Sequence, residues 1–196
     1  MEKHVENLRK NGFTVTEFAT GREAAAYLLE SVHGKTVGLG GSVTLQQLDI
    51  YDRLGQNNTV AWHLVKPGDD TLAAAGAADV YITSANAVSE EGFILNIDGR
   101  GNRVSATLSK KEKVYFVIGE NKLAGPFQEA LERARNIAGP KNAQRLEKKT
   151  PCAAEGVQCF DCRSPERICS ALVVLWRPPF WCEDMEVILV HEDLGY

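Results

Sequence analysis

The sequence predicts an α/β protein with a Rossmann-like, mostly parallel sheet and flanking helices. Short apolar, β-branched runs alternate with helical patterns through most of the 196 residues, as in chains that build parallel sheets. The clearest helix is Pro126–Ala138, where apolar residues recur every three or four positions and Gly139-Pro140 predicts the end. A hydrophobic fraction of 44% and a charged fraction of 24% are ordinary for a globular chain.

Residues 1–33 are expected to form an N-terminal helical segment. Val5 and Leu8 give the first helix a weak apolar face. Thr20 and Glu23 have the spacing of a capping box, which predicts the start of a second helix. Between these helices, Phe13–Phe18 alternates in the manner of a short strand.

Residues 34–149 are expected to form the α/β core, followed by a cysteine-rich loop over 150–170. The expected core strands are Lys35–Gly40, Thr59–Val65, Asp79–Thr83 and Lys113–Gly119, and the expected helices before the last are Ser42–Leu54 and Thr71–Ala78. Phe93–Ile97 and Val104–Leu108 are predicted to pair as a hairpin around a glycine-rich turn. Residues 171–196 are expected to supply two strands that return to the core.

Charge and hydropathy exclude several classes of function. A net charge of −4 and a pI near 5.6 give no general attraction to nucleic acid or to an anionic membrane. The first ten residues carry charges throughout and lack the apolar stretch of a secretory signal. The longest apolar run, Ala171–Trp176, is far too short to span a bilayer. We therefore expect a cytoplasmic protein with reduced cysteines.

A glycine-rich turn between a predicted strand and a predicted helix is the first candidate binding site. Such turns expose N–H groups and the positive end of a helix dipole, which suit phosphates and carboxylates. The residues concerned are Gly40, Gly41, Ser42 and Thr44. Val43 stands where a dinucleotide fingerprint requires glycine, and Gly-Lys-Ser/Thr is absent from the sequence, so no NAD or ATP motif is present. An ordinary tight turn with a helix cap is the alternative.

A second polar stretch begins where a predicted strand ends. Open α/β sheets place ligands at this end of their strands. The candidates are Ser84, Asn86, Asn102 and Arg103, with Arg103 expected to hold a carboxylate or phosphate by two parallel hydrogen bonds. Glu91, beside Gly92, is a candidate general base or nucleophile. A polar turn with a solvated carboxylate is the alternative explanation of the same residues. The four histidines are far apart in sequence and indicate no site.

Four of the five cysteines share one short segment. Cys152, Cys159, Cys162 and Cys169 have the spacing C-x6-C-x2-C-x6-C. Four thiolates can hold zinc or a [4Fe–4S] cluster, and the central C-x2-C pair is a good chelating unit. Four reduced thiols, or a redox dithiol, remain open as alternatives.

Several segments together resemble the lactate-utilization (LUD) domain family, and lactate utilization protein C in particular. They are GLGGSVTL, DVYITSANAVSEEGFILNIDGRGNRVSA, KVYFVIGENKLAGPFQEALERARNIAGPKNAQRL and VILVHEDLGY, from about Gly34 onward. The resemblance implies a fold similar to ribose-5-phosphate isomerase and the CoA transferases, whose glycine-rich loops hold anionic substrates. Gly40–Ser42 matches such a loop, and Glu91 loosely matches the catalytic glutamate of CoA transferases. Lys122, in the matching segment GENKLA, is a further cationic candidate.

The resemblance implies a protein of organic-acid metabolism that binds a small anionic metabolite. The rival expectation is a non-catalytic accessory or electron-transfer protein, whose four-cysteine site docks an iron–sulfur redox partner. Neither the substrate nor the presence of catalysis follows from the sequence, and a homo-oligomer remains open.

Overall fold

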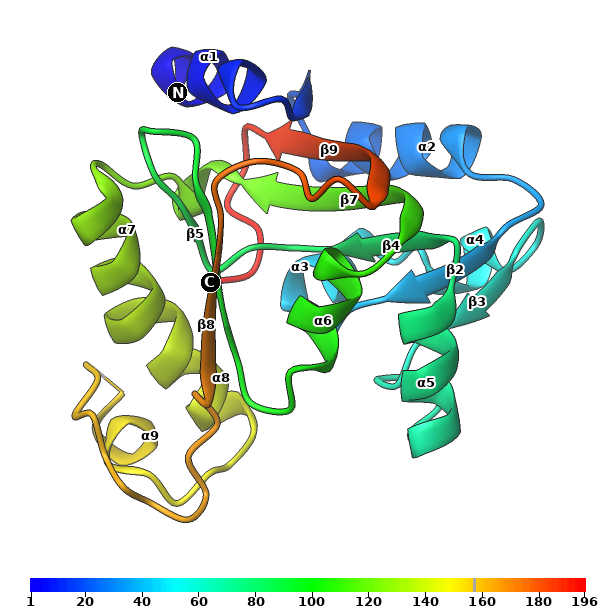
Figure 1. Ribbon diagram of the computed structural model, residues 1–196. Coiled ribbons are helices and arrows are strands. Elements are labelled where there is room, and N and C mark those ends of the chain that lie inside the picture. The colour runs from blue at the N-terminus through cyan, green and yellow to red at the C-terminus, as the bar shows by residue number, and fades with distance from the viewer. Residues whose placement is uncertain (157) are drawn as a thin grey trace.

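A six-stranded parallel sheet forms the centre of the molecule, whose computed structural model describes residues 1–156 and 158–196 (Figure 1). The strand order is β1-β9-β7-β4-β2-β3, and every neighbouring pair is parallel. Its strands are β1 (Thr14–Phe18), β2 (Thr36–Leu39), β3 (Thr59–Ala61), β4 (Val80–Thr83), β7 (Lys111–Gly119) and β9 (Cys182–Val190). The predicted α/β fold with a parallel sheet is confirmed. Because β1 pairs with β9, the N-terminal segment supplies an edge strand of the sheet.

A second, antiparallel sheet of three strands lies beside the first. Its order is β5-β6-β8, with β5 (Ala87–Val88), β6 (Ile94–Asp98) and β8 (Ala171–Leu175). The predicted hairpin is wrong, because α6 (Asn102–Leu108) occupies its second half. Asp98 explains the helix, since its carboxylate accepts hydrogen bonds from the backbone N–H groups of Arg103 and Val104 in the first turn. Only β9 of the two C-terminal strands joins the main sheet.

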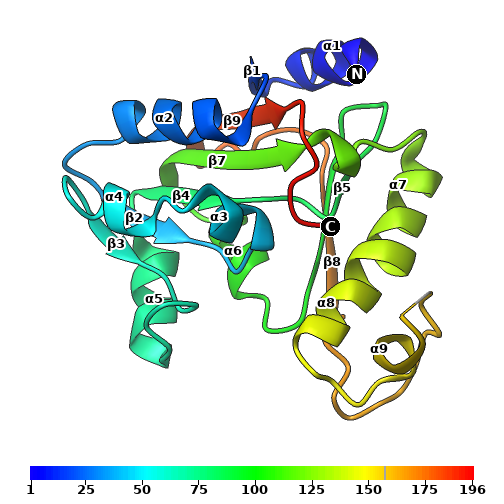
Figure 2. The ribbon, with the colours of Figure 1, turned by 180° about the vertical axis from the view of Figure 1, so that it is seen from behind.

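Helices cover both faces of the main sheet. The remaining α-helices are α1 (Glu2–Lys10), α2 (Gly21–Ser31), α3 (Val43–Leu48), α4 (Tyr51–Leu54), α5 (Asp69–Ala77), α7 (Phe127–Arg133), α8 (Gly139–Arg145) and α9 (Pro151–Glu155). Figures 1 and 2 show α1, α5, α6 and the small sheet on one face, with α2, α3 and α4 on the other. The expected capping box of α2 is present, with Thr20 and Glu23 bonded to each other's backbone. None of the helices in the described residues is both long enough and apolar enough to cross a bilayer.

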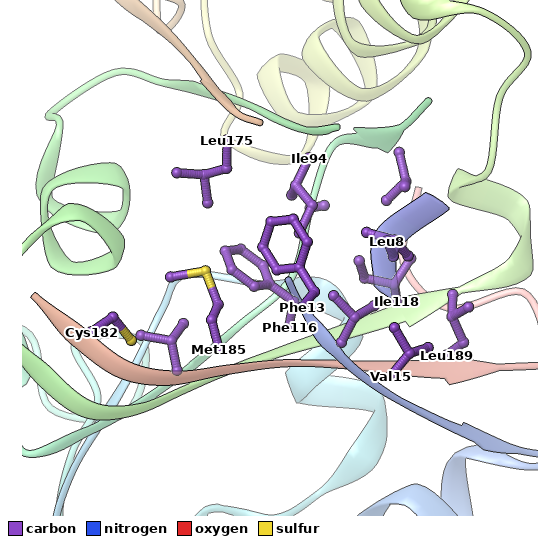
Figure 3. Packing of buried hydrophobic residues seen from close by; sticks show 14 of the residues in the cluster. Leu8, Phe13, Val15, Ile94, Phe116, Ile118, Leu175, Cys182, Met185 and Leu189 are labelled. Carbon is purple, nitrogen blue, oxygen red and sulfur yellow. The ribbon is translucent and has the colours of Figure 1, made fainter. Parts of the chain in front are cut away.

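Strand β7 lies between two of the three hydrophobic clusters of the core, and the third lies between the small sheet and α7. Val114, Phe116 and Ile118 belong to the cluster beneath α1 and the small sheet, whereas Tyr115 and Val117 belong to the cluster beneath α2 and α3. Alternate side chains of a strand point to opposite faces, so a strand covered on both faces is apolar throughout. Figure 3 shows the first cluster, with Phe116 packed among side chains from α1, the small sheet and β9.

The helix predicted over Pro126–Ala138 does not end at Gly139-Pro140. It continues from α7 through a π-helical segment, Ala134–Ala138, into α8. Pro140 fits in the first turn of α8, where a missing N–H costs little. Conversely, the single helix predicted over Ser42–Leu54 is divided into α3 and α4, because Asp49 adopts a left-handed conformation with φ of 49°.

Candidate functional site

A cavity of about 700 Å³ lies at the carboxyl ends of the parallel strands. Strands β7, β4 and β2 are neighbours in the sheet, so the segments that follow them meet at one edge. Eight of the predicted binding residues line this cavity: Gly41, Ser42, Thr44, Ser84, Asn86, Asn102, Arg103 and Lys122. The structure thus brings together polar residues that are up to 81 positions apart in the sequence, from Gly41 to Lys122.

Lys122 lies at the buried end of the cavity, with a residue exposure of 3%. It belongs to the 3₁₀ turn Glu120–Lys122 that follows β7. Its Nζ donates hydrogen bonds to the Thr44 hydroxyl at 2.7 Å and to the Ser84 hydroxyl at 2.8 Å. Burial, reinforced by the positive charges of Arg133 and Arg103, lowers the pKa of Lys122 to about 7. None of the ion pairs among the described residues includes Lys122.

Arg103 is held as a largely buried positive charge in the cavity wall, with a side-chain exposure of 13%. Its guanidinium donates to the Asn96 side-chain oxygen at 2.6 Å and to the backbone oxygens of Ile97 at 2.7 Å and Ser84 at 3.3 Å. Asp98 lies 4.0 Å from Nε, and burial lowers the pKa of Arg103. Three of its five N–H donors already bond to protein acceptors, so the predicted two-pronged contact with a ligand would have to use the remaining ones. Arg103 contributes positive charge to the lining.

The charge of the cavity lining opposes the net charge of the chain. Six cationic side chains line it, against the two carboxylates of Asp98 and Glu166. The cations are Arg100, Arg103, Lys122, Arg145, Lys148 and Arg167. Asp98 pairs with Arg103 and accepts backbone N–H groups of α6, and Glu166 accepts the backbone N–H of Lys149, so the lining keeps an excess of positive charge. We call this region the cationic cavity.

The glycine-rich turn after β2 contributes less to the cavity than its sequence predicts. Gly40 donates its N–H to the Ile82 carbonyl, and its own carbonyl accepts from the Trp62 indole at 3.0 Å. Gly40 therefore has no N–H left for a ligand. A Cβ at Gly40 would lie 2.6 Å from the Thr83 hydroxyl, so close packing against β4 explains this glycine. Ser42 caps α3 by accepting the Leu45 N–H.

His63 is a cavity residue that the sequence did not single out. It lies just beyond β3, facing Gly41, and its Nδ1 is buried without a hydrogen-bond partner among the described residues. Burial, together with Arg100, lowers the pKa of His63, so the imidazole is neutral near pH 7. The sequence signal that could have identified His63 as a cavity residue is its position close to the end of a strand, which also identified Ser84.

Comparison with known protein families shows which family the chain matches. The LUD domain family matches residues 1–190. The chain belongs to the LUD domain family. This confirms the resemblance noted from the sequence and extends it through the first 33 residues. No curated protein sequence matches the chain.

The fold of this LUD domain is also found in a solved structure, described as a DUF162 family protein from Deinococcus radiodurans. The two share 15% sequence identity, and the match covers 96% of this chain and 94% of the other, with a TM-score of 0.55. At this identity the likeness concerns the fold alone.

Glu91 does not lie in the cationic cavity of the LUD domain. It is exposed beside α1, where the Asn11 side chain donates to its carbonyl and the backbone N–H of Phe127 donates to its carboxylate at 3.2 Å. Hydrogen bonding, with the largest contribution from the Ser89 side chain, lowers the pKa of Glu91 and favours its charged form. Its following turn fits tightly against α1, since a Cβ at Gly92 would lie 2.7 Å from the backbone of Asn7. The structure gives Glu91 the position of a helix-capping residue.

The cysteine-rich segment forms a separate wall next to the cationic cavity. Its first part is helix α9, and residue 157 lies outside the described residues. All four cysteines of the segment are free and partly buried. Within the described ranges, no three His, Cys, Asp or Glu side chains are arranged around a single metal ion. Cys152, Cys159 and Cys169 instead line a hollow of about 360 Å³, the cysteine hollow.

Proposed function

We propose that this LUD domain binds a small anionic metabolite in the cationic cavity and serves organic-acid metabolism of the lactate-utilization type. The buried amine of Lys122, which has no carboxylate partner among the described residues, carries the proposal. Removing an ammonium group from water is costly unless an opposite charge accompanies it. Lys122 has two hydroxyl partners and two cationic neighbours, so an anion bound beside it would favour its charged form and gain a buried charge contact.

The excess of cations supports an anionic ligand rather than a neutral one. Six positive side chains around one cavity, in a chain of net charge −4, concentrate positive potential where it attracts carboxylates or phosphates. Arg100, Arg145 and Lys148 lie with Lys122 in this lining. Electrostatic attraction of this kind raises both the affinity and the association rate for anions.

Hydroxyl and amide groups close to Lys122 suit the polar substituents of a hydroxy or oxo acid. Thr44 and Ser84 are buried and hold the ammonium from two sides, and Asn86 lies in the same lining. A ligand carboxylate at Lys122 places its neighbouring oxygen among these groups. His63, neutral near pH 7 with an unpartnered Nδ1 among the described residues, is the side chain of this lining best suited to exchange a proton with a bound ligand.

Calorimetric titration with L-lactate, pyruvate, a phosphosugar and a CoA ester tests the proposal. We expect at least one of these anions to bind, and K122M to weaken that binding by about 100-fold, because a buried charge contact is lost. Variant K35M is the matched control, since Lys35 is a surface partner of Glu112 outside the cavity. Absence of binding by all four anions, or equal binding by K122M and the wild type, contradicts the proposal.

A further inference from the structure

The cysteine segment places three of its four thiols around one hollow, and the cationic cavity does not explain them. The sulfur-bearing residues Cys152, Cys159 and Cys169 come from the two ends and the middle of the segment and meet in the cysteine hollow. Cys162 follows Cys159 in the same turn, where Asp161 adopts a left-handed conformation with φ of 47°. Four cysteines from 18 positions of sequence therefore occupy one small region of the surface.

Several N–H groups point at these sulfur atoms. The Cys159 sulfur accepts from the backbone of Asp161 at 3.4 Å and from the Arg135 guanidinium at 3.6 Å. The Cys169 sulfur accepts from Nε of Arg167 at 3.1 Å. Positive charge and N–H donors stabilise a thiolate, and hydrogen bonds to sulfur are a regular part of iron–sulfur sites. The two arginines also offset the charge of a four-thiolate centre.

The segment is fixed by side chains rather than by a helix or strand. Residues 158–170 contain neither element. Arg167 crosses the turn and donates to the Cys162 carbonyl at 2.7 Å and to the Cys169 carbonyl at 3.0 Å. Asn136 accepts the Cys159 N–H, and the Asp98 carbonyl accepts the Ser170 N–H. Both ends of the turn are thereby attached to the rest of the domain, and Cys159 and Cys169 line the hollow.

The distribution of the thiols favours a cluster over a single ion. Zinc requires four ligands about 2.3 Å from one point, and the described residues contain no such convergence. A cluster instead carries its irons at the corners of a body, so its cysteines surround a volume. We propose that Cys152, Cys159, Cys162 and Cys169 ligate a [4Fe–4S] cluster in the cysteine hollow.

The cluster site shares a wall with the cationic cavity. Five residues line both spaces: Ile97, Gly139, Arg167, Ile168 and Cys169. A cluster ligated by Cys169 fixes the part of the segment that carries Arg167, one of the six cations of the cavity. Loading of the cluster and binding of an anion are therefore coupled through this wall, although the cluster site itself does not depend on the proposed function.

Anaerobic reconstitution of the full chain with ferrous iron and sulfide tests the site. We expect about four iron and four sulfide per chain, a broad visible absorption that dithionite bleaches, and an electron paramagnetic resonance signal after reduction. The double variant C159S/C162S is expected to lose the iron, sulfide and colour. Variant C182S is the matched control, because Cys182 lies in the core on β9 and serine can still donate to the Asp184 carbonyl.

Three outcomes overturn the proposal. They are a wild-type chain that takes up neither iron nor sulfide, a chain that holds one zinc ion without sulfide, and a C159S/C162S variant that retains the cluster. Circular dichroism of each variant shows whether the LUD domain has folded. If the double variant is unfolded, C152S and C169S are measured singly, and retention of the full cluster by both contradicts the ligand set.

Discussion

The cationic cavity and the cysteine hollow lie side by side but are built in different ways. The cavity lies at the carboxyl ends of β2, β4 and β7. Its buried side chains are held by hydrogen bonds to one another and to the backbone of the segments that follow these strands. The cysteine hollow lies between helical and strand residues of the domain and the segment 158–170, which has no helix or strand and is held by Arg167 and a few side-chain contacts. Sheet ends position side chains rigidly, whereas such a loop depends on local contacts.

This difference separates two kinds of mutational effect. The buried residues of the cavity, such as Thr44, Ser84 and Lys122, are packed in the folded domain, so their replacement changes stability together with binding. The four cysteines of the segment are partly buried and belong to none of the three hydrophobic clusters. Their replacement is expected to change what the segment binds more than how the domain folds. The predictions below test this contrast, from the largest expected effect to the smallest.

Replacing Arg103 tests whether the cavity wall is part of the folding core. The change R103L removes a buried guanidinium and leaves the acceptors Asn96, Ile97 and Ser84 without their donor. Breaking a buried polar network of this kind costs about 3 kcal/mol of unfolding free energy. Urea unfolding measures the loss. R100L is the control, because Arg100 is exposed on the neighbouring turn; equal effects of the two changes would contradict a structural role for Arg103.

Replacing Lys122 is expected to act on stability in the opposite direction. K122M removes a buried charge without a counter-ion and should raise the unfolding free energy by about 2 kcal/mol near pH 6. The folded-state pKa of Lys122, about 7, lies below its ordinary value of 10.5. Between these values the unfolded chain binds the additional proton, so wild-type stability rises with pH. The advantage of K122M therefore shrinks from pH 7 to pH 10, and thermal unfolding across this range measures the trend.

Anion binding should have the reverse dependence on pH. An anion prefers the protonated form of Lys122, whose pKa is about 7 in the free cavity. Affinity is then constant below about pH 6 and falls up to about tenfold per pH unit above about pH 7. Calorimetry with the tightest of the four anions, at intervals of one pH unit from pH 6 to pH 9, measures the slope. K122M should show weak binding without this slope, and the same slope in K122M would assign the titration to another group.

Sequence reasoning found the sheet and the cavity for the same physical reason. Strand ends of a parallel sheet converge, so Thr44, Ser84 and Lys122 meet although each comes from a different strand connection. The sequence could not show which hydrogen-bond donors are already bonded within the protein. Three N–H groups of the Arg103 guanidinium and the N–H of Gly40 bond to protein acceptors, which only three-dimensional packing reveals.

The errors of sequence reasoning have local causes. Val104–Leu108 has the composition of a strand, yet the Asp98 carboxylate starts a helix there, and β6 pairs instead with the distant strand β8, with Ile97 opposite Leu172. The catalytic role of Glu91 stays a prediction, but the turn that follows Glu91 packs against α1 and Glu91 does not line the cavity. Long-range pairing and the direction of a turn are decided by tertiary packing.

The smallest effect is expected for the cysteine segment in the absence of iron. Without a bound cluster, C159S/C162S should change the unfolding free energy by less than about 1 kcal/mol, since neither thiol belongs to a hydrophobic cluster. After reconstitution, only the wild type should gain stability, because a ligand that binds the folded state alone shifts the unfolding equilibrium. Parallel urea titrations of both proteins, with and without iron and sulfide, measure the two differences. A loss of several kcal/mol in the iron-free variant would show that the segment belongs to the folding core and would remove the contrast with the cavity.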